Sequence, residues 1–558
     1  MSLDDSIEKF ALANAAKFNG KANQGSVISH VISEHPEVKS NMKEVAKKIG
    51  EIVAKINKLG VEKQLALLQE KYPEMLEKKE KEERDIFAFL KINEGDAVKS
   101  AFPPGPEKYP HIGHAKAAVL NYMLAKRYNG RFILRFEDTN PELVKSEFYD
   151  IMQENFKWLG IEWDELQYAS DHMELFYNYA IQIIGDGKAY VCTCPVDLMR
   201  SNRQNGFECN CRSNSPEQNA HLWAHMPTLA QGAAVLRLKI DLKHQNSTMR
   251  DPTIFRIIDT PHARLGSKFR VWPNYDWQNA IMDGKFGITH RLRSKEFEMR
   301  SELQRYVQTL LGLHNTVTYE FARFNLEGVE SSGRVIREKI QNGELVGWDD
   351  PTLTTIVALR RRGFTAEAIK SFIVSTGMTK SESTLTWDDL ILHNKRVLDE
   401  SSDRMFFVKD PVKVKIAGAP KQKVELHRHP MHRRGGRFFE THDEFWLSKD
   451  DVDTLKTKEL YRLMDCLNFR KKGKAFEFDS VEHANYKDKG SRIMHYLPVQ
   501  QDLVNVEVMM PDKQVVKGLG EPTMNGLKVG DIIQSERFGY MRLDRKEKGK
   551  LIFWFTHA

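Results

Sequence analysis

Several features that would place a chain of this length in a simple class are scarce or missing. Only five cysteines occur in 558 residues, too few for the disulfide framework of a secreted protein. No apolar run approaches the roughly 18 residues that a membrane-spanning helix requires. The first residues, MSLDDSIEKF, are acidic where a secretory leader would be basic. The sequence therefore predicts a cytoplasmic protein with no membrane partner.

A strong excess of one charge is also missing. The chain has 84 Lys and Arg against 77 Asp and Glu, which gives a net charge of +7. Only local clusters of basic residues can therefore indicate an anionic partner such as nucleic acid. The length predicts three to four domains, at about 150 residues per domain.

The sequence pattern divides the chain into four segments, which together predict a multidomain α/β fold. Residues 1–95 show the apolar spacing of helices. Residues 96–324 alternate strands, loops and helices, as a parallel doubly wound sheet requires, and contain a segment, 171–267, that is long enough to be an inserted domain. Helical signals return over 325–400. Short alternating apolar runs over 401–558 predict β-barrels.

The stretch YPHIGHAKAA, residues 109–118, places a helix directly after a loop. A helix start directs backbone N–H groups and a partial positive charge outward, which suits a phosphate. Gly113 allows close approach to the backbone. His111 and His114 share a face and can donate hydrogen bonds to a triphosphate. By itself the pattern also fits a helix start with incidental histidines.

Longer stretches around this motif resemble the class I glutamyl- and glutaminyl-tRNA synthetases, most closely the archaeal glutamyl members. SAFPPGPEKYPHIGHAKAA and RFILRFEDTNP resemble the first half of their active site, in which HIGH is the ATP signature. RVWPNYDWQNAIMDGKFGITHRLRSKEF resembles the second half, and GWDDPTLTTIVALRRRGF resembles the stretch after the second signature.

The resemblance implies a ligase of protein biosynthesis. Such an enzyme uses ATP with Mg²⁺ to convert L-glutamate to glutamyl-adenylate, and then transfers the glutamyl group to the 3′ end of tRNA(Glu). The implied fold has a Rossmann-like catalytic domain, an inserted acceptor-stem-binding domain, a helical connecting domain with a KMSKS-like loop, and C-terminal anticodon-binding barrels. Catalysis then depends on positioning and charge stabilisation.

Residue roles follow from the matching motifs. The resemblance places His111, Gly113 and His114 at the ATP. The residues expected to bind the amino acid are Glu137, Tyr275, Asn279 and Arg293. Glu137 matches the acid that holds the α-ammonium, and Arg293 is expected to bind the side-chain carboxylate through two parallel hydrogen bonds. On charge pattern alone, Arg293 would be a surface arginine and Glu137 part of a helix cap.

Two positions depart from the family pattern. Ala101 stands where the family usually has an arginine that contacts the amino acid, and Lys108 in the same loop is a candidate substitute. In LEGVESSGRVIREKI, residues 331–334 stand where the KMSKS-like loop should supply a lysine to the developing pyrophosphate charge. Arg334 is the nearest cation there, so we expect it to bind ATP and act in catalysis.

Four of the five cysteines form two CxC pairs, Cys192 with Cys194 and Cys209 with Cys211. Four thiolates on two short turns can form a closed, tetrahedral structural zinc site. The alternative is four reduced cysteines that only pack, but their polar surroundings offer no core. We expect zinc to brace the inserted domain.

A basic stretch, HRHPMHRRGGR at 427–437, lies in the segment that resembles the anticodon-binding barrels. Phosphate contact is the physical interpretation, and an exposed solubilising loop is the alternative. The candidate tRNA-binding residues are Arg428, Arg433, Arg434 and Arg437. RLRSK and ALRRRGF are predicted to extend this basic surface, although the latter also fits a helix end.

Other functions remain open at this point. A glutaminyl-tRNA synthetase shares these motifs, although Asn279 stands where glutaminyl enzymes commonly have histidine. Ala101 also fits a catalytically weakened tRNA-binding relative. A simple nucleotidylyltransferase would need neither the insertion nor the barrels. The sequence leaves open whether tRNA(Gln) is charged as well as tRNA(Glu).

Overall fold

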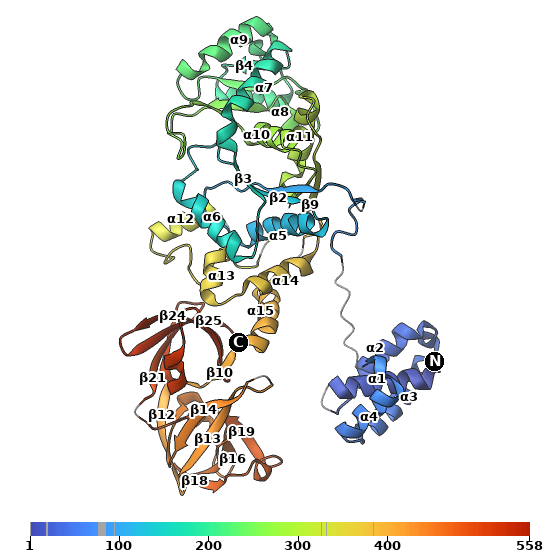
Figure 1. Ribbon diagram of the computed structural model, residues 1–558, viewed down its shortest axis with the longest axis vertical. Helices are drawn as coiled ribbons and strands as arrows, with labels where there is room; N and C mark the ends of the chain where they lie inside the picture. The colour runs from blue at the N-terminus through green and yellow to red at the C-terminus, as the bar shows by residue number, and fades with distance from the viewer. Residues whose placement is uncertain are drawn as a thin grey trace. The chain divides into compact units, whose positions relative to one another are not determined.

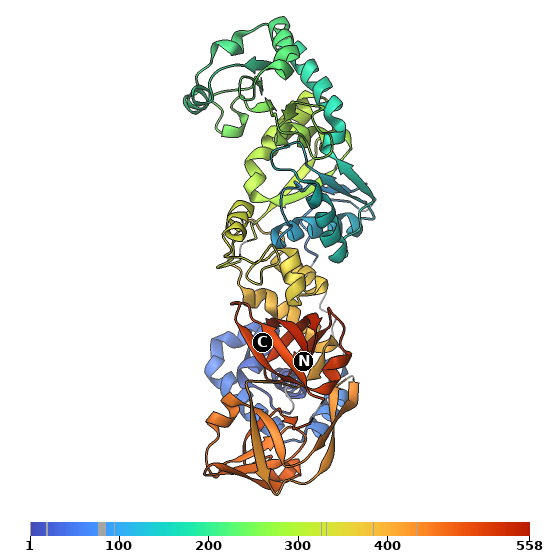
Figure 2. The same ribbon diagram turned by 90° about the vertical axis from the view of Figure 1, so that its left-hand side faces the viewer.

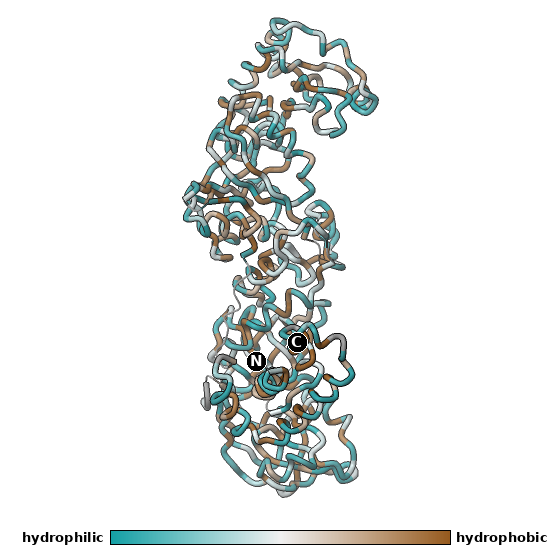
Figure 3. Tube along the Cα trace, turned by 90° about the vertical axis from the view of Figure 1, so that its right-hand side faces the viewer, coloured by the Kyte–Doolittle hydropathy of each residue, from teal (hydrophilic) through white to brown (hydrophobic). Residues whose placement is uncertain are grey.

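The computed structural model describes residues 2–17, 20–75, 85–93, 95–324, 326–330, 332–382, 384–431, 433–500 and 502–558. The chain forms two compact units, Met1–Ala88 and Phe89–Ala558. Hydrophilic and hydrophobic residues alternate over short distances along the trace (Figure 3). Within the described ranges no helix has the length and apolar character needed to cross a membrane.

The first unit is helical, as its apolar spacing predicts. It contains α1 (Leu3–Lys17), α2 (Gln24–Glu34), α3 (Met42–Asn57) and α4 (Val61–Lys71). Apolar residues three or four positions apart form one buried face of α3, which packs into the core of the unit. The buried residues of this face are Val45, Ile49, Val53 and Ile56.

The second unit is built around a five-stranded parallel sheet. Its order is β3-β2-β1-β8-β9. The strands are β1 (Lys99–Phe102), β2 (Arg131–Phe136), β3 (Glu165–Tyr168), β8 (His290–Ser294) and β9 (Val317–Phe321). The chain runs outward from β1 in one direction and later from β8 in the other, so the order reverses between these two strands. Ligands bind at such a switch point in doubly wound sheets.

Helices cover this sheet and lead into the next segment. α5 (Ile112–Arg127) follows β1 and packs on it, and α6 (Ser146–Trp158) follows β2. α10 (Tyr275–Lys285) precedes β8, and α11 (Glu298–Leu310) follows it. The strand, helix, strand order that the sequence predicts for this part is confirmed.

Residues 171–267, the expected insertion, contribute to a separate antiparallel sheet of order β4-β5-β6-β7. Its strands are β4 (Ala189–Cys192), β5 (Val235–Leu238), β6 (Thr253–Ile257) and β7 (Val271–Pro273), and its helices are α7 (Met173–Gly185), α8 (Val196–Asn205) and α9 (Pro216–His225). In Figures 1 and 2 these helices lie at one end of the second unit. α7 shares a core with α10 and α11, in which Trp272 and Trp277 are fully buried, and Leu222 and Trp223 of α9 pack against it. The insertion is thus packed against helices of the parallel sheet.

Four helices connect the parallel sheet to the C-terminal strands: α12 (Gly333–Gln341), α13 (Ile356–Arg362), α14 (Ala366–Thr376) and α15 (Trp387–Ser401). Figure 1 shows α13 to α15 between the two sheet regions.

The short helix α13 is tied to both neighbours. Thr355, its N-cap, pairs with His111 in an isolated β-bridge. At its other end, Arg362 is buried and donates to the carbonyl oxygen of Thr556 at 3.0 Å. Arg361 pairs with Asp544 at 2.7 Å. The ALRRRGF arginines that were predicted to extend a basic surface are therefore partly used inside the fold.

The C-terminal segment consists mainly of strands, as the alternating pattern predicts, with the short helix α16 (Lys449–Thr454) and the 3-10 turns His483–Asn485 and Pro522–Gly526 between them. One seven-stranded sheet has the order β10-β23-β24-β25-β21-β22-β11, and the other β19-β16-β17-β18-β12-β15-β20. The first contains β10 (Asp403–Met405), β11 (Phe407–Lys409), β21 (Val504–Met509), β22 (Val515–Gly520), β23 (Ile532–Ser535), β24 (Gly539–Glu547) and β25 (Lys550–His557). The second contains β12 (Pro411–Ala417), β15 (Glu444–Ser448), β16 (Leu460–Leu463), β17 (Asn468–Lys472), β18 (Ala475–Ser480), β19 (Gly490–Met494) and β20 (Leu497–Pro498). A hairpin of β13 (Gln422–His429) and β14 (Arg433–Thr441) accompanies them, and each sheet has its own apolar core.

Candidate active site

A cavity of about 800 Å³ opens at the carboxyl ends of the parallel strands. Phe102 at the end of β1, Glu137 after β2, Ser294 at the end of β8 and Phe321 at the end of β9 all line it. The cavity therefore lies at the switch point between β1 and β8, where this class of sheet binds ligands.

His111 and His114 line the cavity as neutral hydrogen-bond donors. His111 is the N-cap of α5, and its Nδ1 accepts the amide of Gly113 at 3.0 Å, while Nδ1 of His114 accepts the amide of His111 at 3.2 Å. Burial lowers the pKa of His111 to about 3 and holds the pKa of His114 well below its ordinary value. Because an accepting ring nitrogen carries no proton, each neutral ring is protonated on Nε2. The two rings, whose centroids are 4.0 Å apart, therefore offer a pair of N–H donors.

The backbone that carries these histidines is fixed from two sides. Segments 110–112 and 354–356 exchange two backbone hydrogen bonds, of 3.0 and 2.9 Å. A Cβ atom at Gly113 would lie 2.8 Å from Cε1 of His111, closer than real Cβ contacts. Glycine at this position thus allows the His111 ring to fold over the start of α5.

Glu137 is a buried carboxylate that its neighbours hold in place. Arg135 donates to it from Nη2 at 2.8 Å and from Nε at 3.1 Å, and Asn279 donates at 2.9 Å. Gln278 also donates to it. Burial raises the pKa of Glu137, and the guanidinium of Arg135 opposes that rise. The result is an immobilised acid on the cavity wall, suited to binding an ammonium group.

Asn279 does not line the cavity as an amino-acid contact would. Its side chain is fully buried on α10, and its amide nitrogen is used by Glu137. Tyr275, the first residue of the same helix, does line the cavity. Of these two predicted amino-acid contacts, Tyr275 therefore faces the cavity, whereas Asn279 lies behind it and contacts Glu137.

Strand β8 directs two arginine side chains to the cavity. Arg291 and Arg293 are two residues apart, so they share one face of the sheet. Nη1 of Arg293 donates to Gln304 at 2.9 Å, and Arg291 pairs with Asp283. Sequence analysis selected Arg293 and passed over Arg291, although the alternation in THRLRS was the available signal. Guanidinium groups in this position can bind a carboxylate.

Lys108 lies at a different place from the one expected of a substitute for the charge that Ala101 lacks. It lines the cavity beside Gly333, at the start of α12, where a Cβ would come within 2.7 Å of the Lys108 Cδ. Burial lowers the pKa of Lys108. Arg323, which follows β9, lines the same cavity and was not selected from the sequence.

Arg334, the predicted pyrophosphate cation, points elsewhere in this structure. Its side chain is 81% exposed and lies 3.7 Å from Glu338 on the same helix. Ser332 and Gly333 line the cavity, whereas Ser331 lies outside the described residues. The N-terminus of α12 therefore faces the cavity while the arginine side chain does not.

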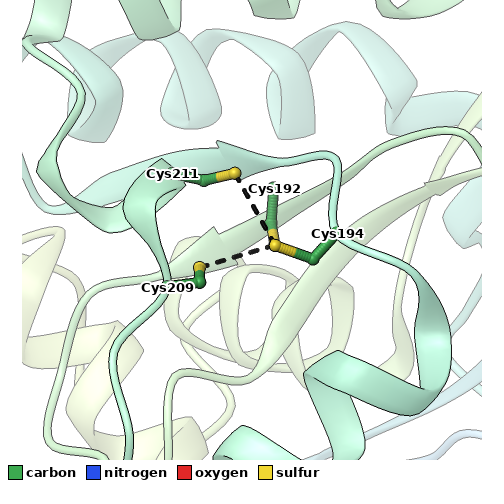
Figure 4. Close-up of side chains that lie close together, drawn as sticks. All are labelled: Cys192, Cys194, Cys209 and Cys211. Carbon is green, nitrogen blue, oxygen red and sulfur yellow. Dashed lines mark hydrogen bonds between the residues drawn. The ribbon is translucent and has the colours of Figure 1, made fainter.

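The four clustered cysteines meet in space (Figure 4). Their Sγ atoms all lie within 4.8 Å of one another, and two pairs, Cys192 with Cys209 and Cys194 with Cys211, are 3.9 Å apart. Four sulfurs at zinc bonds of about 2.3 Å form a tetrahedron with edges of about 3.8 Å. The spacing of the two cross-pairs fits that geometry, so these residues could hold a zinc ion.

The predicted basic loop is mostly the hairpin of β13 and β14. Arg428 is 44% exposed at its side chain and lies 3.8 Å from Asp403. The side chains of Arg433 and Arg434 lie outside the described part of the chain.

Arg437 does not belong to an exposed basic surface. It is 2% exposed, and its Nη2 donates to the buried carboxylate of Glu521 at 2.6 Å. Strand alternation turns it inward, opposite to its neighbour Phe438, which is 68% exposed. This position corrects the expectation that Arg437 contacts tRNA.

Comparisons with known proteins agree with this geometry. The family described as "tRNA synthetases class I (E and Q), catalytic domain" matches residues 97–400. Two families described as the anti-codon binding domain of the same synthetases match residues 402–487 and 488–544.

Similar proteins match over the whole length. A glutamate-tRNA ligase of Pyrococcus abyssi is 41% identical over 568 residues, covering 98% of each chain. One of Pyrococcus furiosus is 39% identical over 575 residues, covering 100% of each. A solved glutamate-tRNA synthetase of Elizabethkingia anophelis is 17% identical with a TM-score of 0.42, over 55% of this chain and 72% of its own.

Proposed function

The chain belongs to the class I tRNA synthetases of the glutamate and glutamine family, and from this premise we propose that it is a glutamate-tRNA ligase. It activates L-glutamate with ATP and Mg²⁺ and transfers the glutamyl group to the 3′ end of tRNA(Glu) in the cytoplasm, where translation takes place. The observation that carries the proposal is one cavity in which paired histidine donors, a buried acid and arginines from β8 meet.

In the activation step, a glutamate carboxylate oxygen attacks the α-phosphorus of ATP and pyrophosphate leaves. His111 and His114 donate from Nε2 to phosphate oxygens, which stabilises the negative charge of the transition state. Neutral rings suit this task, because each carries an Nε2–H group that donates a hydrogen bond and no proton has to be transferred. The protein supplies no covalent nucleophile.

The amino acid is held by its charges. Glu137 accepts the α-ammonium, Tyr275 lines the path beside it, and Arg293 binds the side-chain carboxylate. Asn279 supports this binding by orienting Glu137. A cavity that contains arginines favours a carboxylate over the neutral amide of glutamine.

Pyrophosphate leaves toward the start of α12. The backbone N–H groups at the start of α12, where Gly333 lies, and the ammonium group of Lys108 supply positive potential there. Arg334 reaches the phosphates after its side chain rotates away from Glu338. Together, these three groups take the place of the lysine that the family motif would supply.

Two further parts serve the tRNA. A zinc ion held by Cys192, Cys194, Cys209 and Cys211 would brace the inserted segment through its structural, closed coordination. Arg428, Arg433 and Arg434 would contact phosphates from the β13–β14 hairpin.

The test is charging with purified protein and radiolabelled glutamate or glutamine, each with tRNA(Glu) and with tRNA(Gln). We expect glutamyl-tRNA(Glu), and loss of most activity in H111A and in H114A. Glutaminyl-tRNA would instead identify a glutaminyl enzyme, and glutamyl-tRNA(Gln) would show charging of both tRNAs. Tight tRNA binding with no activation of either amino acid would refute the ligase.

A further inference from the structure

Arg291 has hydrogen-bonding capacity that the protein does not use. Its side chain is 2% exposed, and its Nη2 group pairs with Asp283. Its Nε and Nη1 groups find no acceptor among the described residues, although the side chain lines the cavity. A guanidinium stays charged at any relevant pH, and buried donors are nearly always paired in native proteins. An acceptor supplied by a ligand would satisfy these donors.

The charges around Arg291 already balance without a ligand. Arg135 lies 2.8 Å from Glu137 and 2.9 Å from Asp283, and Arg291 completes a cluster of two cations and two anions. Asp283 thus has Arg135 as a second partner. A ligand that brings an ammonium to Glu137 and a carboxylate to Arg291 keeps this buried cluster neutral, whereas a ligand with either charge alone does not.

The position of Arg291 relates it to the missing arginine. In the parallel register Ser100 pairs with His290, so Ala101 and Arg291 are neighbours on adjacent strands. Ala101 is fully buried among apolar residues and contributes no charge. Arg293 follows on the same face of β8, about 6.6 Å further along the strand. Two guanidiniums thus approach one region of the cavity from a single strand.

We propose that Arg291 is a substrate-binding residue that joins Arg293 in holding the side-chain carboxylate of glutamate. It provides from β8 the guanidinium that position 101 lacks. This role rests on the proposed function. A second arginine also favours glutamate over glutamine. The amide NH₂ group of glutamine would face the N–H donors of Arg291, and neither group can accept a hydrogen bond from the other.

The experiment is tRNA-dependent pyrophosphate exchange, in which KM is measured separately for glutamate and ATP. In R291V, loss of a charged hydrogen-bonding partner should raise the glutamate KM roughly 10- to 100-fold. The ATP KM should stay within about twofold, since the proposed partner of Arg291 is the amino-acid carboxylate and not a phosphate. R305V, which removes an exposed arginine of α11, is the matched control and should change neither constant.

R291K separates substrate binding from a purely structural role. A lysine keeps the charge beside Asp283 but has no planar fork for a carboxylate. We expect the glutamate KM of R291K to rise at least fivefold, with thermal unfolding near that of the wild type. A wild-type glutamate KM in R291K would overturn the proposal, as would an equal rise of both constants in R291V.

The double variant A101R/R291V moves the guanidinium to the neighbouring strand. Recovery of the glutamate KM by fivefold or more relative to R291V supports the proposal. No recovery, in a protein that keeps the wild-type ATP KM, counts against it. Failure of the proposed function itself would show in the wild type, as absence of glutamate-dependent exchange.

Discussion

Replacing Arg437 by methionine should destabilise the C-terminal β region and leave tRNA binding intact. Nε and Nη2 of Arg437 donate to Glu521, which is fully buried. Removing one member of a buried ion pair typically costs about 3–5 kcal/mol, because the other charge stays buried without its partner. The amide of Phe406 also donates to Glu521, at 2.7 Å, which retains part of the carboxylate's stabilisation. We therefore expect a loss of about 3 kcal/mol, the lower end of that range.

Two measurements on R437M check this reasoning. The first is urea unfolding followed by tryptophan fluorescence and circular dichroism, in which the transition of the β region should shift to lower urea. The second is the salt dependence of tRNA affinity. An arginine that contacts a phosphate contributes roughly 0.7–0.9 to the slope of log K against log salt. R437M should keep the wild-type slope.

Arg428 supplies the matched control for Arg437. It is exposed, and surface pairs like its contact with Asp403 contribute only about 0–1 kcal/mol. R428M should therefore unfold like the wild type and lower the salt slope. The double variant R437M/E521M, which replaces both charges by apolar groups, should recover part of the lost stability. Wild-type unfolding of R437M together with a reduced slope would refute the burial argument.

The remaining predictions concern the active site, the cysteines and acid stability. In E137Q, loss of the charge that binds the ammonium should raise the glutamate KM roughly 10- to 100-fold in pyrophosphate exchange, while an unchanged KM would exclude that role. K108A should raise the ATP KM and slow exchange, and a rise confined to the glutamate KM would instead assign Lys108 to the amino acid. C209S should lose bound zinc in elemental analysis and raise the tRNA KM, and zinc content equal to the wild type would refute the four-thiolate site. Burial lowers the pKa of His495 to about 4 in the folded protein, against about 6.5 in the unfolded chain. As the pH falls below 6.5, the unfolded chain takes up a proton that the folded protein does not, so acidification favours unfolding. At pH 5 this effect is about 2 kcal/mol, and H495Q should show a correspondingly flatter loss of stability between pH 7 and 5, measured by urea unfolding.

Local patterns made the main architecture predictable from the sequence. The start of α5 follows from a loop, a histidine cap and an apolar helix, and the parallel sheet follows from repeated strand and helix signals. The convergence of the four cysteines also follows, since two CxC turns at the ends of a compact segment favour one cluster.

Long-range packing set the limit of that prediction. Nothing near Arg437 in the sequence indicates Glu521, 84 residues away, so its burial was not predictable. Asn279 was assigned to the substrate because its motif matches, whereas the fold turns it toward Glu137. Arg291 and Arg293 could have been paired from strand alternation alone, once β8 was recognised as a strand.

The short helix α13 connects the histidine loop to the last strand of the chain. Its seven residues span about 10 Å, with the histidine loop hydrogen-bonded at one end and the last strand of the chain at the other. The backbone that carries the two histidine donors is therefore connected through α13 to a strand that lies outside the parallel sheet.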